Sequence, residues 1–248
     1  MKSTDCKILG INFFNGLFVD SLKLANEGGL VVAPSGPGLA SDLLRCADYE
    51  KSLLEADLVL PDSGLMCLFQ KLFSGQKVKR ISGLKFLKNY LNKFVQDESS
   101  FWIMPNQSQD KKNRSWLLEN HGFEINDEDS YCAPLYNESG PIEDPLLLSR
   151  IIQMKPKTIF IQLGGGVQER LGLFLKGHLK YNPTILCTGA ALAFLSGEQV
   201  CIPKWADQLY LGWLLRCLFN PKLYLPRYVK AFRLIFMLFK YGAKNPNS

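Results

Sequence analysis

Short apolar runs alternate along this chain with amphipathic stretches. The apolar runs are rich in β-branched residues and bounded by Gly, Pro, Asp or Asn, and they predict strands at residues 7–11, 30–34, 58–61, 101–104, 158–163 and 184–187. The stretches between them place apolar residues with helical spacing, and they predict helices at residues 39–54, 65–73, 84–95, 111–120 and 145–153. Strands that alternate with helices predict an α/β fold, with a Rossmann-like parallel sheet and helices on both of its faces.

The pattern changes after residue 197, where the chain becomes strongly apolar and basic. Residues 205–219 and 224–241 predict two helices, which Asn220 and Pro221 separate. We therefore predict an α/β domain at residues 1–197 and a basic, apolar C-terminal appendage at residues 198–248. The acidic stretch at residues 126–144 is interpreted as an ordered connection within the first unit.

The composition is that of a folded protein with an uneven charge. The 248 residues are 47% hydrophobic and 21% charged, which excludes a wholly disordered chain. The net charge is +6, but from Lys204 onward eight Lys or Arg residues accompany one acidic residue, Asp207. This end therefore carries +7, and residues 1–203 sum to −1. A near-neutral body with a basic, apolar tail does not indicate a nucleic-acid-binding protein.

The cysteines and histidines indicate no metal site. The seven cysteines are odd in number and widely scattered, and none has the ligand spacing of a structural zinc site. We expect reduced thiols, as in a cytosolic protein, with no disulfide framework and no bound metal or other cofactor. His121 and His178 lie in polar surroundings and are interpreted as surface residues.

Candidate site residues follow the predicted strands, because ligands of parallel α/β sheets bind beyond the carboxyl ends of the strands. Gly36 and Gly38 follow the second strand. They would let backbone amides approach a phosphate, although a tight turn into the next helix is the simpler interpretation. Asp62 follows the third strand, where it is either the N-cap of the next helix or a general base.

Two further segments carry candidate chemistry. Arg80 ends a run of cations that forms either a solvated loop or a forked contact to a diphosphate. Gly164, Gly165 and Gly166 follow the fifth strand, and they either bring the backbone close to a ligand or form a flexible turn. Gln168 follows them, and its amide is suited to hydrogen-bond a sugar or a base.

One interpretation of these residues is a nucleotide-dependent oxidoreductase that binds NAD. Gly36 and Gly38 would then belong to a dinucleotide-binding turn, and Asp62 would supply the acid at the end of the next strand. Against this, Ser41 stands where such a turn has Gly or Ala, and no obvious hydride-transfer site accompanies it.

Taken in order, the same segments resemble the WecG/TagA/CpsF family of bacterial glycosyltransferases, glycosyltransferase family 26. No single motif is decisive, but the combination at the C-terminal end is specific. The resemblance covers roughly residues 7–230 and rests on Leu60-Pro61-Asp62, Arg80-Ile81-Ser82-Gly83, residues 164–169, Gly189, Gly197, Pro203-Lys204-Trp205, residues 211–216, Pro221 and Arg227-Tyr228.

The resemblance implies an inverting enzyme that needs no metal. It would move N-acetylmannosamine, its uronic acid or glucose from a UDP-sugar to a polyprenyl-diphosphate-linked sugar, in cell-surface polysaccharide synthesis. Asp62 falls at the position of the general base, and Arg216 and Arg227 match arginines that meet the lipid diphosphate. The expected substrate-binding residues include the strand-end glycines. They are Gly36, Arg80, Gly164, Gly165, Gln168 and Glu169.

The chain departs from the family pattern beside the expected cleft. Pro34 to Gly36 replace Thr-x-Asn, Gly166 and Val167 replace Pro-Lys, Cys201 replaces Arg, and Gly212 replaces Glu. These changes leave the donor sugar open. A non-catalytic, membrane-docking relative of the transferase is a further alternative, against which the joint presence of Asp62, Arg80 and Gln168 argues.

The C-terminal helix suggests where the protein acts. Arg227, Lys230, Arg233 and Lys240 fall on one side of this helix, and large apolar residues occupy the other positions. Such a helix can lie in the interface of an anionic membrane, so we expect a peripheral protein on the cytoplasmic face of the cell membrane. The alternative is a helix that packs on the body with a solvated basic face. No apolar run predicts a transmembrane helix, and homo-oligomer formation stays open.

Overall fold

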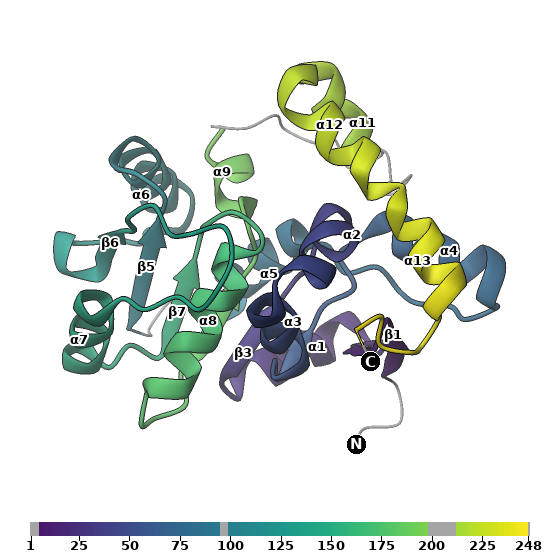
Figure 1. Cartoon of the computed structure of the whole chain (residues 1–248). Coiled ribbons are helices and arrows are strands. Elements are labelled where there is room, and N and C mark those ends of the chain that lie inside the picture. Colours follow the sequence, from purple (N-terminus) through teal and green to yellow (C-terminus); the bar gives the residue numbers. More distant parts are fainter. Residues whose placement is uncertain (1–4, 95–98, 198–211, 248) are drawn as a thin grey trace.

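The chain forms a parallel sheet, which confirms the predicted α/β class. A computed structural model describes residues 5–94, 99–197 and 212–247 (Figure 1). All neighbouring strands of the main sheet run parallel. Its six strands lie in the order β4 (Leu58–Val59), β3 (Gly29–Val32), β8 (Thr184–Cys187), β7 (Thr158–Ile161), β5 (Ser100–Met104) and β6 (Ser130–Cys132).

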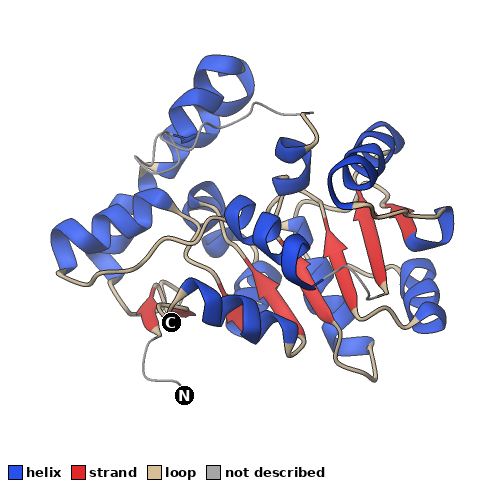
Figure 2. Cartoon of the chain, turned by 180° about the vertical axis from the view of Figure 1, so that it is seen from behind, coloured by secondary structure: helices blue, strands red, loops and turns tan. Residues whose placement is uncertain are grey.

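Helices cover both faces of this sheet (Figure 2), and each face has its own apolar core. Strand side chains alternate between the cores, since Leu30 and Val32 belong to one and Val31 to the other. The interior strands β3, β8 and β7 are buried along their whole length and mostly apolar, because helices cover both faces of the sheet. One core contains residues of α2 (Gly36–Arg45), α3 (Ala47–Leu54), α7 (Pro145–Met154) and α8 (Val167–His178), and the other contains residues of α1 (Phe18–Asn26), α5 (Gly83–Phe94), α6 (Gln107–His121) and α9 (Ala191–Leu195).

The first predicted strand is wrong in its extent and its pairing. Residues 7–11 do not form one strand of the sheet; β1 (Cys6–Ile8) and β2 (Ile11–Phe13) instead form a separate antiparallel hairpin. The chain reverses at Leu9 and Gly10, which have φ angles of 51° and 82°. Two consecutive positive φ angles suit a tight hairpin turn, and glycine reaches such an angle without strain.

Other elements also differ from the predicted pattern. The acidic stretch contains the edge strand β6, which has three residues, of which only Ser130 is buried, and it therefore shows no apolar run. The helix predicted at residues 39–54 is divided at Cys46, which is extended with φ −129° and ψ 102°, into α2 and α3. The helix predicted at residues 65–73 is α4 (Gly64–Phe69), which continues into the π-helical turn η1 (Gln70–Ser74).

The C-terminal part contains three described helices, α11 (Gly212–Phe219), α12 (Pro221–Ala231) and α13 (Arg233–Tyr241). The second predicted helix is thus divided at Phe232, and the predicted residues 205–211 lie outside the described part of the chain. Pro221 begins α12, where its missing N–H leaves no bond unmade. None of the helices in the described part of the chain is long and apolar enough to cross a membrane.

The last helix packs on the α/β body along α4 (Figure 1). Leu234, Met237 and Leu238 are buried in the same core as α2 and α4. The chain beyond α13 is also fastened to the body, because the Leu9 N–H donates to the Gly242 carbonyl at 2.8 Å and the Asn247 amide donates to the Glu50 carboxylate at 2.7 Å. One side of α13 is therefore part of the folded core.

Candidate active site

Three of the predicted segments meet at the carboxyl edge of the sheet. They follow β3, β4 and β7, which the strand order places on either side of β8. A Cβ added at Gly36, after β3, would lie 3.1 Å from Ser63 Oγ, after β4. A Cβ added at Gly165, after β7, would lie 3.9 Å from Ser35 Oγ. The topology therefore assembles one site from loops that are distant in sequence.

Asp62 and Arg80 form the charged pair of this site. The Arg80 Nε–H donates to the Asp62 carbonyl at 2.8 Å, and Arg80 Nη2 lies 3.8 Å from Asp62 Oδ1. Asp62 Oδ1 also accepts a hydrogen bond from the Gly83 N–H, at the start of α5, at 3.1 Å. The Asp62 side chain is 26% exposed and that of Arg80 is 20% exposed. The carboxylate is thus oriented by the protein and still open to a ligand.

Asp62 is not the N-cap of the helix that follows it, so that alternative is wrong. The N-cap of α4 is Ser63, whose side chain accepts from the Met66 N–H at 3.3 Å. Ser63 satisfies the helix end that Asp62 was expected to satisfy. The carboxylate of Asp62 is directed to Gly83 and Arg80 instead.

Gly36 lies in a capped turn at the start of α2. Ser35 is the N-cap, accepting from the Gly38 N–H at 3.3 Å, and Pro37 follows in the first turn. The tight-turn interpretation of this segment is therefore confirmed. A Cβ at Gly36 would lie 4.0 Å from Leu234 Cδ2, so α13 begins beside this edge of the site.

Residues 164–166 are called the glycine loop from here on. Gln168 and Glu169 are buried behind this loop rather than exposed in front of it. Gln168 Oε1 accepts from the Gly189 N–H at 2.7 Å, and Gln168 Nε2 donates to Glu169 Oε1 at 2.9 Å. Glu169 Oε2 accepts from the Gly166 N–H at 2.6 Å. Burial raises the pKa of Glu169 to about 7, against the hydrogen bonds, which favour its ionised form. The pair ties the loop after β7 to the loop after β8.

Gly164 and Gly165 are exposed, and a Cβ added at Gly164 would meet no atom within 4 Å. Their backbone is therefore open to a ligand. Gly166 is buried and has a φ of 87°, an angle that favours glycine. The loop needs glycine at Gly166 for its conformation, whereas at Gly164 no neighbouring protein atom requires it.

Arg170 is a site-supporting residue that the sequence analysis missed. Its guanidinium is buried and donates to three carbonyl oxygens, those of Gly166 at 2.8 Å, Gly140 at 2.6 Å and Asn137 at 2.7 Å. It joins the glycine loop to the stretch predicted as an ordered connection. In the sequence, Arg170 is noticeable only as a charged residue among the apolar positions of α8. Its partners are backbone carbonyl oxygens, and no sequence motif indicates them.

Other predicted residues lie around or outside this arrangement. Lys230 and Arg233 are exposed on α12 and α13. Arg216 lies on α11 and Arg227 on α12, and the structure describes the backbone of both and not their side chains; Cys201 lies outside the described residues. Within the described part of the chain, no three His, Cys, Asp or Glu side chains are grouped so as to hold a metal ion.

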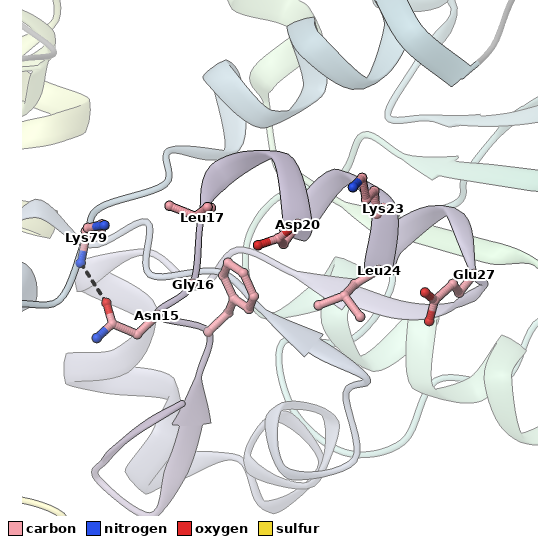
Figure 3. A pocket seen from close by; sticks show the side chains of 9 residues that line it. Asn15, Gly16, Leu17, Asp20, Lys23, Leu24, Glu27 and Lys79 are labelled. Carbon is pink, nitrogen blue, oxygen red and sulfur yellow. Dashed lines mark hydrogen bonds between the residues drawn. The ribbon is translucent and has the colours of Figure 1, made fainter. Parts of the chain in front are cut away.

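A pocket of about 410 Å³ lies along α1 and does not include Asp62 or Gln168 (Figure 3). At one end the Lys79 N–H donates to Asn15 Oδ1 at 3.0 Å, and Lys79 directly precedes Arg80. The lining is mixed in character, with apolar, acidic and basic side chains: Phe14, Asn15, Gly16, Leu17, Asp20, Lys23, Leu24, Glu27 and Lys79.

Comparison with known proteins decides the family. The sequence model of the Glycosyl transferase WecG/TagA/CpsF family matches residues 6–248. The chain belongs to this family. The transferase is 22% identical over 210 residues to an N-acetylglucosaminyldiphosphoundecaprenol N-acetyl-beta-D-mannosaminyltransferase of Bacillus subtilis, covering 82% of this chain and 78% of the relative. It is 23% identical over 219 residues to the protein of the same name from Bacillus spizizenii, covering 83% and 79%.

Membership of this family confirms the predicted resemblance and makes the protein a glycosyltransferase. The oxidoreductase alternative is therefore set aside. The glycine-containing turn that suggested it is the capped start of α2 in the transferase.

Proposed function

We propose that this transferase moves a sugar from a UDP-sugar to a polyprenyl-diphosphate-linked sugar, with Asp62 as the general base. The observation that carries the proposal is the Asp62 carboxylate, which Arg80 and Gly83 hold in a partly exposed position at the carboxyl edge of the sheet. The names of the two Bacillus relatives support N-acetylmannosamine as the sugar and a diphosphoundecaprenol-linked N-acetylglucosamine as the acceptor.

The chemistry requires one proton acceptor. The acceptor hydroxyl oxygen attacks the anomeric carbon and forms the new C–O bond while the bond to UDP breaks on the opposite face, which inverts the configuration. The UDP oxygen leaves with the electron pair, and the hydroxyl proton moves to the Asp62 carboxylate. Arg80 fixes the orientation of Asp62, and its partly exposed guanidinium can share a hydrogen bond with the diphosphate.

The glycine loop would hold the donor. Gly164 and Gly165 offer exposed backbone amides, and Gly36 lies across the site from them. Gln168 and Glu169 would act from behind, because their hydrogen bonds fix the loop that carries these amides. Arg216 and Arg227 stay as predicted contacts to the lipid diphosphate.

The C-terminal helices would bring the enzyme to its lipid-linked acceptor. Lys230 and Arg233 are exposed, as are Phe232, Phe236 and Phe239. Cations beside exposed aromatic side chains suit the interface of an anionic membrane. We therefore propose a peripheral enzyme at the cytoplasmic face of the membrane, with residues 198–248 as its appendage.

A donor screen with the full chain tests the proposal. UDP release is measured with the UDP-linked forms of N-acetylmannosamine, its uronic acid and glucose, each with a short-chain polyprenyl-diphosphate N-acetylglucosamine as acceptor. We expect release with the first donor only when the acceptor is present, and a product of inverted anomeric configuration. Transfer of only the uronic acid or glucose would overturn the donor assignment. An absence of transfer from all three, with a folded protein, would support the non-catalytic alternative.

A further inference from the structure

Two segments that are far apart in sequence meet in a cluster of aromatic rings. The rings of Phe69, at the end of α4, and Phe239, on α13, lie edge to face with centroids 4.6 Å apart. Phe73, on η1, lies 5.2 Å from Phe239 and 5.0 Å from Phe69. The Phe69 ring is buried, whereas Phe73 and Phe239 are 62% and 61% exposed. The cluster thus runs from the core of the body to its surface.

The exposed part of this cluster continues along both segments. Leu72 precedes Phe73 on η1 and is 63% exposed, and Phe236 lies one turn before Phe239 on α13 and is 65% exposed. The opposite side of α13 is already buried in the core. We call Leu72, Phe73, Phe236 and Phe239 the η1–α13 surface. Large apolar side chains exposed on two segments that pack together are typical of a contact surface rather than of an ordinary solvated face.

Both sequence segments that carry this surface are basic. Residues 63–96, which include η1, contain seven Lys or Arg residues and no Asp or Glu. Residues 212–248, which include α13, also contain seven Lys or Arg residues and no Asp or Glu. Lys71 and Lys240 directly adjoin the η1–α13 surface in sequence, and both are exposed. The near-neutral sum over residues 1–203 therefore conceals a basic segment beside the basic appendage.

This combination fits a lipid bilayer better than a second copy of the chain. In a symmetric dimer the same surface would face itself, which would bring cations against cations with no acidic partner in either segment. An anionic bilayer accepts both features, since its acyl region takes the aromatic side chains and its headgroups attract the lysines.

We propose that η1 and α13 form one membrane-contact surface, so that the α/β body itself binds an anionic bilayer together with the C-terminal helices. The inference rests on the proposed function, in which the acceptor is held in the membrane. α4 joins Asp62 and Ser63 to η1 and has six residues, a length of about 9 Å. Contact through η1 would therefore set the base at a short, fixed distance from the bilayer, where the acceptor diphosphate lies.

Flotation of the full chain with vesicles tests this surface. The test variant is Leu72→Ser with Phe73→Ser, and the matched control is Leu118→Ser with Leu146→Ser, whose side chains are 53% and 64% exposed on α6 and α7. With vesicles of phosphatidylglycerol and phosphatidylethanolamine, we expect the test variant to bind at least about tenfold more weakly than the wild type and the control to bind equally. With phosphatidylcholine vesicles, we expect all three to bind weakly. All four side chains are exposed, so thermal unfolding should confirm that both variants stay folded.

A second pair of variants decides whether the body takes part. If Phe236→Ser with Phe239→Ser abolishes binding while the η1 variant binds like the wild type, contact is confined to the C-terminal helices and the proposal is overturned. If the η1 variant changes only the oligomeric state, measured by light scattering, the surface is a dimer interface and the proposal is again overturned.

Transfer to a short-chain, water-soluble acceptor is measured in parallel and should be unchanged in the η1 variant. If the wild type itself shows no transfer, the proposed function is overturned, whereas the vesicle result still decides whether η1 contacts the membrane.

Discussion

Arg80 holds Asp62 through the backbone as well as through charge. Its Nε–H donates to the Asp62 carbonyl at 2.8 Å, while Nη2 lies 3.8 Å from the Asp62 carboxylate. The shorter contact is a directed hydrogen bond and the longer one is an ion pair. A guanidinium can make both contacts at once because its donors are arranged in a rigid fork, so the position of the Asp62 carboxylate depends on arginine in particular.

Replacing Asp62 by Asn should lower the rate of transfer by about 10²- to 10⁴-fold, which is the range for loss of a general base. The amide keeps an oxygen that can accept from Gly83, so the fold should persist. UDP release and thermal unfolding measure the two effects. Glu119→Gln, which removes an exposed carboxylate on α6, should leave both unchanged. Normal turnover in the Asn variant would show that another group takes the proton.

Replacing Arg80 by Lys should keep the positive charge and still reduce transfer, by about ten- to a hundredfold. An ammonium cannot contact the Asp62 carbonyl and carboxylate with the same planar geometry. The effect should be on kcat more than on KM if Arg80 acts through the position of Asp62. Arg45→Lys makes the same change at an exposed position of α2 and should be silent. Equal rates in the two variants would mean that charge alone matters at residue 80.

Replacing Gly164 by Ala should weaken donor binding without weakening the fold. A Cβ at Gly164 meets no protein atom within 4 Å, so any cost must come from the ligand. We expect KM for the UDP-sugar to rise about tenfold if the donor approaches this backbone. Gly177→Ala is the control, because a Cβ there also meets nothing within 4 Å. Unchanged KM in both variants would place the donor away from the glycine loop.

The stability of the protein should depend on pH through Glu169. Burial raises the folded-state pKa of Glu169 from its ordinary value of 4.5 to about 7, so between these pH values the folded state binds more protons than the unfolded state. This difference in pKa contributes to the free energy of unfolding. The stabilisation is fully present below pH 4.5 and is lost as the pH rises through 7, and it amounts to at most about 3 kcal/mol.

Denaturant unfolding across this pH window tests the assignment. In Glu169→Gln the free energy of unfolding should not show this decrease with rising pH. In Glu119→Gln, which changes an exposed position, it should depend on pH as in the wild type. Parallel curves for the wild type and Glu169→Gln would show that Glu169 has the same pKa in the folded and unfolded states.

The sequence predicted the elements whose signal is local. The buried parallel strands are continuous apolar runs, which is why β3, β4, β5, β7 and β8 were found at nearly their observed places. The edge strand β6 was missed because it is only three residues long and its one buried residue is the polar Ser130. The hairpin at Leu9 and Gly10 was missed because one apolar run hides a turn, and the turn is visible only in the backbone angles.

The candidate site divides in the same way. Sequence alone determined which strand-end motifs are candidates for the chemistry, since Asp62, Arg80 and the glycine loop belong to motifs whose order resembles the family. Only the tertiary structure decided that Ser63 is the cap of α4, that Gln168 lies behind the loop, and that Arg170 holds it.

The charge distribution shows the same limit. Summing charge along the chain identified a basic tail, but it could not show that a second basic segment, at η1, lies against α13. Periodicity and composition report on neighbours within a few residues, so they determine strands, helices and motifs. Burial, hydrogen-bond partners and shared surfaces depend on which distant segments the sheet order brings together, and for this protein only the fold decided them.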